Sequence, residues 1–192
     1  TFELLLACRA LHAASGGAFD PTVGPLLRAL GFRGAPPADE PGLAAARALV
    51  GMQHVELEPQ AMTVRFARPG MALDLGAIGK GHALDLAGAV LREHGVHDAL
   101  LHGGTSSVLA LGAPPGLPGW RIGIGPWSPQ PVATVCNEAL SVSAGHGRRQ
   151  PQANGALAAH VVDPHTGEPV ALGSALSAVV ATTRAGSSGT AW

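Results

Sequence analysis

The segment DLGAIGKGHALDLA, residues 74–87, has the side chains and spacing of an anion-binding turn. It holds the only lysine of the 192 residues, whereas eleven arginines supply the other strongly basic side chains. Gly76, Gly79 and Gly81 surround Lys80 just before a predicted helix. The first N–H groups of a helix lack intrahelical acceptors, and glycines let the backbone approach a phosphate closely. A lysine adds a compact positive charge.

The same segment matches neither of the two familiar phosphate-binding patterns. A Walker A loop requires Ser or Thr after the lysine, and here Gly81 follows it; the spacing G-x-G-x-x-G is also absent. A tight strand-to-helix turn with a solvated lysine is therefore the alternative interpretation of Lys80.

Further candidate residues lie in the segment HVVDPHTGEPV, residues 160–170, and in a glycine pair. His160 is suited to general-base chemistry near neutral pH, although a lone histidine on a strand is more often a structural group. Asp163 is typical of a turn in which its carboxylate accepts backbone N–H groups. Gly103 and Gly104 either permit close approach of a ligand or bend a hairpin.

The composition suits one folded domain, with room for two lobes, and excludes some partners. Apolar residues make up 46% of the chain and the net charge is -1, so a core is expected and nucleic acid is not an expected partner. No apolar run is long enough to span a membrane. Cys8 and Cys136 fit no metal or redox spacing. A disulfide between them stays open, but two small buried residues are the preferred interpretation.

Hydrophobic periodicity predicts an α+β protein with helices concentrated in the N-terminal part and strands in the C-terminal part. Asp20 is expected to cap a helix that starts at Pro21 and ends at Gly31, and loops are expected over 33–42 and 148–155. Other helices are predicted over 2–14, 44–50 and 83–94, the last with an apolar face of Ala83, Leu84, Ala87, Val90 and Leu91. Strands are predicted over 54–58, 62–67, 98–102, 107–112, 120–124, 132–136, 139–143, 157–162 and 174–183.

Several motifs together resemble the ApbE family, the FAD:protein FMN transferases. DLGAIGKGHALDLAGAVLREHGV is similar to the family's core motif. Its other motifs find counterparts, in the family's order, in SGGAFDPTVGPLLRALGF (15–32), ALLHGGTSSVLALG (99–112), WRIGI (120–124), SVSAGHG (141–147) and HVVDPHTGEPV (160–170). The resemblance implies a single compact ApbE-like (T-fold-like) domain over residues 1–192. It further implies that the family's N-terminal segment and C-terminal end are absent.

The resemblance also implies a reaction: Mg2+-dependent transfer of FMN from FAD to a Thr or Ser hydroxyl of a flavin-accepting redox protein, with release of AMP. It implies catalytic roles for His160 and Lys80. Contacts to FAD would come from Asp74, Gly76, Ala77, Gly79, Lys80, Gly81, Gly103, Gly104, Asp163 and Thr166, and Mg2+ ligands from the Ala77 carbonyl and Thr190. Asp163 and Thr166 are expected to shape the site, and Asp74 either holds a flavin hydroxyl or caps local N–H groups. A bacterial protein of the periplasm or inner membrane is implied, with the cytoplasm left open.

This chain departs from the family pattern at two positions that bear on activity. The family's last motif, A-D-A-x-x-T-A, corresponds to AGSSGTA at residues 185–191, so Gly186 replaces a metal-binding aspartate while Thr190 matches the threonine. Magnesium is usually held by one or two carboxylates, so its binding should be weakened. Thr105 stands where an aspartate is usual. A flavin-binding relative without transferase activity, and a chain that keeps only the fold, are therefore alternatives.

Overall fold

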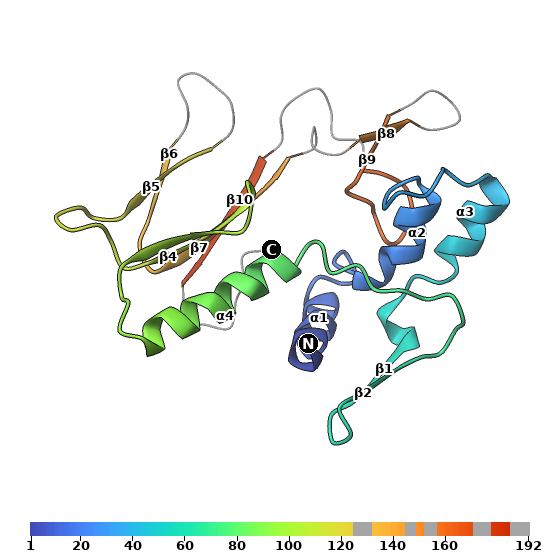
Figure 1. Cartoon of the computed structure of the whole chain (residues 1–192). Coiled ribbons are helices and arrows are strands. Elements are labelled where there is room, and N and C mark those ends of the chain that lie inside the picture. The colour runs from blue at the N-terminus through green and yellow to red at the C-terminus, as the bar shows by residue number, and fades with distance from the viewer. Residues whose placement is uncertain (125–131, 145–148, 152–156, 171–177, 185–192) are drawn as a thin grey trace. The chain divides into compact units, whose positions relative to one another are not determined.

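The computed structural model describes residues 1–124, 132–144, 149–151, 157–170 and 178–184 (Figure 1). Contacts within the chain gather into two compact units. The first consists of Thr1–Leu75 with Gly145–Leu176, and the second of Gly76–Ala144 with Ser177–Trp192. Helices dominate the early part and strands the later part, which confirms the predicted α+β class. Among the described residues, no helix is both long and apolar enough to cross a membrane.

The first unit combines short helices with two separate hairpins. Apolar side chains of its first helix pack with the first hairpin around Phe2, Leu5, Met52, Val55 and Leu57. Strands β1 and β2 pair antiparallel, as do β8 and β9. The elements are α1 (Phe2–Ala14), η1 (Pro21–Val23), α2 (Gly24–Ala29), α3 (Glu40–Arg47), η2 (Met52–His54), β1 (Val55–Glu58), β2 (Thr63–Phe66), β8 (Arg149–Pro151) and β9 (Leu157–Ala159).

Asp20 caps the turn that starts at Pro21, as the sequence predicts. Its Oδ1 accepts hydrogen bonds from the Thr22 N–H at 2.8 Å and the Thr22 hydroxyl at 2.5 Å. Its Oδ2 accepts the N–H of Met52 at 3.2 Å. The side chain is buried, so these bonds replace the water that the carboxylate gives up on folding. Asp20 therefore ties the turn to the segment that precedes β1.

Several predicted boundaries are wrong. Helix α3 begins at Glu40, inside the segment predicted as a loop, because Asp39 accepts the Gly42 N–H at 3.0 Å and Pro41 lies in the first turn, where it fits. Strand β8 occupies part of the expected 148–155 turn. Strand β9 ends at Ala159, earlier than predicted.

The second unit is a four-stranded antiparallel sheet of order β10-β7-β4-β3, with helix α4 along it (Figure 1). Strand β4 is buried along its length, and its side chains alternate between two faces. Leu109 and Leu111 pack with Leu84 of the helix, whereas Val108 and Ala110 pack with Ile122 and Val135 of the β5–β6 hairpin. The elements are α4 (Gly79–Glu93), β3 (Ala99–His102), β4 (Ser107–Leu111), β5 (Trp120–Gly123), β6 (Val132–Val135), β7 (Glu138–Ala144) and β10 (Ala178–Arg184).

Helix α4 differs from its prediction at its start and on its buried face. It begins at Gly79 and not at Ala83, so Lys80 lies within the first helical turn. Leu84 and Gly88 are the buried residues, while Val90 of the predicted apolar face is 52% exposed. A Cβ on Gly88 would lie 2.8 Å from Cδ2 of Leu109, so the absent side chain lets the helix approach the sheet closely and turns that face inward.

The two cysteines have different environments, and both are free. Cys8 is buried as predicted, and burial raises the pKa of its thiol to about 11, which keeps it protonated and unreactive at neutral pH. Cys136 is exposed, so the expectation of two buried residues is wrong for this one.

The turn between β3 and β4 also approaches α4 closely. A Cβ on Gly103 would lie 3.3 Å from Cδ1 of Leu84 and 3.5 Å from Cβ of Lys80. Gly104 has a φ of +74°, a conformation that glycine and asparagine adopt most readily, with no heavy atom within 4 Å of the place where a Cβ would be. Close packing thus favours glycine at position 103, and the left-handed backbone favours glycine or asparagine at position 104.

We expect Gly103→Val to lower the free energy of unfolding by roughly 2 kcal/mol, because a side chain there would push Leu84 away from the sheet. The adjacent Gly104→Asn is the matched control: asparagine tolerates the left-handed backbone and meets open space, so a change below about 0.5 kcal/mol is expected. Urea unfolding followed by circular dichroism measures both. Equal destabilisation by the two variants would contradict the close approach of Gly103 to the helix.

Candidate functional site

The first turn of α4 presents backbone donors and one cation together. Ile78 precedes the helix and is buried at 1% exposure, and no side chain caps this end. The first hydrogen bond of the helix runs from the His82 N–H to the Ile78 carbonyl at 3.0 Å. The N–H groups of Gly79, Lys80 and Gly81 therefore precede the intrahelical ladder, and Lys80 itself is exposed. Such a turn can bind an anion through N–H groups, helix dipole and ammonium together.

Within the second unit, the glycine pair lies beside this turn. Gly103 sits against the stem of Lys80 and against Leu84, as described above. Gly76 and Ala77, just before the helix, are exposed, and so is Gly104. The structure thus brings Lys80 and Gly103 together, and it favours a packing role for Gly103, whereas contact of either residue with a ligand stays a prediction.

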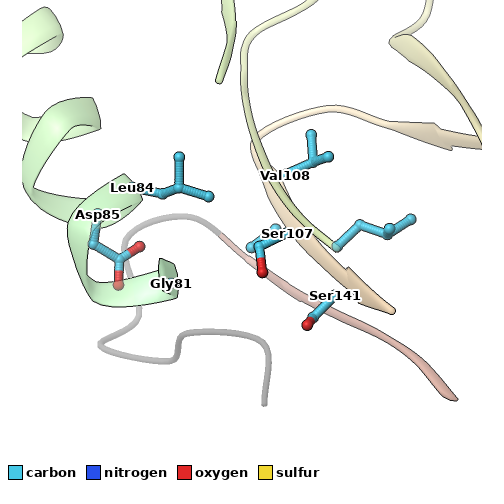
Figure 2. A pocket seen from close by; sticks show the side chains of 8 residues that line it. Gly81, Leu84, Asp85, Ser107, Val108 and Ser141 are labelled. Carbon is cyan, nitrogen blue, oxygen red and sulfur yellow. The ribbon is translucent and has the colours of Figure 1, made fainter. Parts of the chain in front are cut away.

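A small pocket lies between α4 and strands β4 and β7 (Figure 2). Asp85 faces it from the helix, and Ser107 and Ser141 line it from the strands. Its volume of about 10 Å³ suffices for about one water molecule and no nucleotide. Asp85 is exposed as a residue, yet partial burial beside the pocket raises the pKa of its carboxyl, an effect that the nearby charges of His82 and Arg92 oppose.

Asp74 forms a contact that the sequence did not predict. Its Oδ2 accepts hydrogen bonds from Nε and Nη2 of Arg33 at 2.7 and 2.5 Å, and its side chain is 12% exposed. Its backbone N–H donates to the carbonyl of Pro21 at 2.7 Å. The interpretation of Asp74 as a cap for local N–H groups did not include this ion pair, which joins residues 41 positions apart in the sequence.

The segment around Asp163 is a hydrogen-bonded turn. Oδ1 of Asp163 accepts the His165 N–H at 2.9 Å, and Oγ1 of Thr166 accepts the Glu168 N–H at 3.2 Å. The Asp163 carbonyl accepts the N–H of Gly167 at 2.8 Å. The bond to His165 confirms the turn predicted for Asp163, whereas a role of Asp163 and Thr166 in shaping a ligand site stays a prediction. His160 follows β9 directly and is exposed.

A larger pocket in the first unit connects two sequence motifs that lie far apart. Its volume is about 200 Å³. The His165 ring lies against Gly17, with Cε1 2.9 Å from the place where a Cβ would be. His12 Nδ1 lies 3.4 Å from Oδ2 of Asp20. The sequence analysis missed this pocket because its lining comes from residues 12–20, 50–53 and 164–165, which no local pattern connects. The lining residues are His12, Gly16, Gly17, Asp20, Val50, Gly51, Gln53, Pro164 and His165.

The residues expected to hold magnesium are described only in part. No group of three or more His, Cys, Asp or Glu side chains that could hold a metal ion is present among them. The carbonyl of Ala77 is one expected ligand, and Ala77 is exposed. Thr190 and Gly186 lie outside the described residues.

The predicted site residues divide between the two units. His160, Asp163, Thr166 and Asp74 belong to the first, and Gly76, Ala77, Gly79, Lys80, Gly81, Gly103 and Gly104 to the second. Only six positions of continuous chain separate Asp74 from Lys80. The assignment of the residues of both units to one site stays a prediction.

Comparisons with known proteins agree on a single family. The sequence profile of the ApbE family matches residues 1–191. An FAD:protein FMN transferase of Rhodobacter capsulatus is 37% identical over 175 residues, which are 88% of this chain and 33% of that protein. One of Klebsiella pneumoniae is 30% identical over 175 residues, 88% of this chain and 53% of that protein.

Solved structures of family members are similar as well. The flavinyl transferase ApbE of Pseudomonas stutzeri, in its apo form, has a TM-score of 0.73 and 32% identity, covering 88% of this chain and 53% of that one. The ApbE protein of Thermotoga maritima has a TM-score of 0.75 and 27% identity, covering 88% and 56%. The chain thus spans between a third and somewhat more than half of the length of these relatives. With a profile match over nearly every residue and this shared fold, the chain belongs to the ApbE family.

Proposed function

We propose that the protein binds FAD and transfers its FMN part to a threonine or serine hydroxyl of a partner protein. The observation that carries the proposal is the exposed Lys80 in the uncapped first turn of α4, in a chain whose relatives are FAD:protein FMN transferases. A pyrophosphate carries two negative charges. This turn offers N–H donors, the positive end of the helix dipole and the positively charged ammonium group of Lys80.

The reaction breaks the phosphoanhydride bond of FAD and forms a phosphate ester bond to the acceptor hydroxyl. The acceptor hydroxyl oxygen attacks the phosphorus of the FMN part, and a new P–O bond forms. The bond from that phosphorus to the bridging oxygen of the pyrophosphate breaks, and AMP leaves with this oxygen. Because charge develops on phosphoryl oxygens, positioned positive groups accelerate such a step most.

The proposed roles of the chain's own residues follow from that chemistry. Lys80 and the N–H groups of Gly79 and Gly81 hold the pyrophosphate and offset its charge. His160 accepts the proton of the attacking hydroxyl, and its exposure leaves it open to a partner protein. Asp163 maintains the turn that follows His160 through its bond to the His165 N–H.

Magnesium dependence is part of the proposal and rests on the family resemblance. The ion would be held by the Ala77 carbonyl and Thr190, and when bound it offsets the pyrophosphate charge. Gly186 supplies no carboxylate at the position where the family has aspartate. A relative that binds FAD but has lost transfer is the second candidate, and Gly186 favours it.

The proposed partner is a flavin-carrying redox protein that offers a Thr or Ser to the active site. By the same resemblance, we propose a bacterial protein of the periplasm or of the inner-membrane surface.

The direct test incubates the protein with FAD, Mg2+ and an acceptor segment of a flavin-carrying redox protein from the same organism. An active transferase should add the mass of FMN to the segment, make it fluorescent and release AMP, whereas the segment with its acceptor threonine changed to valine should stay unmodified. Binding of FAD without labelling would support the second candidate. Absence of binding to FAD and ADP, by isothermal titration calorimetry, would contradict both.

Lys80→Ala should weaken FAD binding roughly ten- to a hundredfold, because a charge-assisted contact to phosphate contributes about 1.5–3 kcal/mol. Lys80→Arg keeps the charge, so this variant should lose less FAD affinity than Lys80→Ala does. Calorimetric titration with FAD and with riboflavin, which has no phosphate, separates the effects: riboflavin affinity should be equal in all three proteins. Unchanged FAD affinity in Lys80→Ala would remove Lys80 from the site.

Gly186→Asp should strengthen Mg2+ binding, because it adds a carboxylate, the ligand type this cation prefers. We expect a larger rise of the melting temperature when Mg2+ is added to the FAD-bound variant than to the FAD-bound parent, by differential scanning fluorimetry. Gly186→Asn, which adds a neutral side chain of the same shape, is the control. An equal Mg2+ response in the parent and Gly186→Asp would place the metal ligands elsewhere.

A further inference from the structure

The small pocket of the second unit brings polar side chains of three elements together (Figure 2). Asp85 lies in the second turn of α4, and Ser107 begins strand β4. Ser141 of β7 is the register partner of Ser107, so both serine side chains lie on the same face of the sheet. Leu109, two residues after Ser107, packs against the helix from that face. The remaining lining residues are apolar or glycine.

The Ser107 hydroxyl is the group in this pocket that most needs a hydrogen-bond partner. Ser107 is only 8% exposed, and within the part of the chain that the structure describes its side chain forms no hydrogen bond. The Ser141 hydroxyl donates to the Ser106 carbonyl at 3.4 Å, which leaves its oxygen lone pairs for another donor. Buried hydroxyl groups without a partner are rare, and an ordered water molecule commonly satisfies them.

The Asp85 carboxylate is a hydrogen-bond acceptor at the edge of the same pocket. Its side chain forms no hydrogen bond to the described residues. Partial burial raises the pKa of this carboxyl, which means that the charged form has lost part of its hydration. A donor inside the pocket would restore some of what the carboxylate has lost.

The size and the chemistry of the pocket select a water molecule over a metal ion. The volume of about 10 Å³ holds about one water, whereas Mg2+ usually keeps several waters of its own. Only one carboxylate lines the pocket. Water has two donors and two acceptors, so it can donate to Asp85 and Ser141 and accept from Ser107. Three hydrogen bonds are typical of a buried water.

We propose that this pocket binds one long-lived water molecule that links Asp85 of α4 to Ser107 of β4 and Ser141 of β7. The water satisfies the buried hydroxyl and connects the second turn of the helix to two strands, in addition to the leucine packing. Through this water, Asp85 acts as a positioning residue for the start of α4, where Lys80 lies. The inference goes beyond the function proposed above and does not depend on it.

A high-resolution crystal structure of the parent protein, grown with rubidium chloride as the salt, tests the occupant directly. We expect one density peak about 2.6–3.0 Å from the Asp85 carboxylate and from both serine hydroxyl oxygens, without an anomalous signal. An anomalous peak would identify a monovalent cation and overturn the proposal. A dry pocket, or a direct hydrogen bond between Asp85 and Ser107, would overturn it as well.

Amide hydrogen exchange tests the role of Asp85 in solution. Asp85→Ala should accelerate exchange at residues 82–85 roughly fivefold, because the bridge loses its helix end. Alanine is the better helix former, so a purely local effect of this variant would slow exchange instead. Asp85→Asn keeps an oxygen acceptor and should stay within about twofold of the parent. Parent-like exchange in Asp85→Ala, or equal acceleration in Asp85→Asn, would contradict the role of Asp85.

A double-mutant cycle tests whether Asp85 and Ser107 act through one shared partner. Each alanine variant should raise the unfolding equilibrium constant in urea, and the double variant should raise it by less than the product of the two effects, because either change loses the same water. Glu93→Ala is the matched control: Glu93 is an exposed carboxylate at the end of the same helix, and its effect should multiply with that of Ser107→Ala. Multiplicative effects for Asp85 and Ser107 would overturn the bridge.

Discussion

The close packing of helix α4 against strands β3 and β4 is the constraint that determines where Lys80 lies in the second unit. Gly88 lets the helix approach Leu109, and Gly103 lets the β3–β4 turn approach Leu84. Burying leucines of this kind contributes about 2–5 kcal/mol each relative to alanine, so the helix is held firmly. The turn that carries the only lysine of the chain is thereby held against the sheet by leucine packing that Gly88 and Gly103 permit.

The attraction of an anion to that turn depends on nearby charges and not on the net charge of the chain. The chain has a net charge of only -1, so a general field cannot draw an anion to it. Lys80 is exposed in the first helical turn, where the helix dipole has the same sign. Asp74, the carboxylate two residues before Gly76, is paired with Arg33. The first turn of α4 therefore has the donors and charge that suit an anion, and the pyrophosphate of FAD is the anion proposed above.

Local patterns predicted most elements of the fold. Alternating apolar residues located strands β1, β2, β3 and β4 to within a residue or two, and the Asp20–Pro21 cap was evident from residue types. The start of α4 was missed because glycines argue against a helix, and packing overrode that preference. Helix α3 was placed late although Asp39 and Pro41 were a readable start signal.

The candidate site was less accessible to sequence reasoning. Lys80 and its glycines were recognisable because they are contiguous. The Arg33–Asp74 pair joins positions 41 residues apart, and the pocket that places His165 against Gly17 joins two distant motifs. Neither leaves a periodic signal, since both arise from tertiary contacts. For Gly103, the sequence offered ligand approach or hairpin bending, and the structure adds a third reason, the nearby helix.

The central claim is that backbone N–H groups in the first turn of α4 bind phosphate. Its most direct test is an ADP titration of isotope-labelled protein followed by amide NMR. The account predicts that the largest shifts occur at the amides of Gly79, Lys80 and Gly81, with an affinity that falls as salt rises. Saturable shifts confined to other segments, with these three amides unmoved, would contradict it.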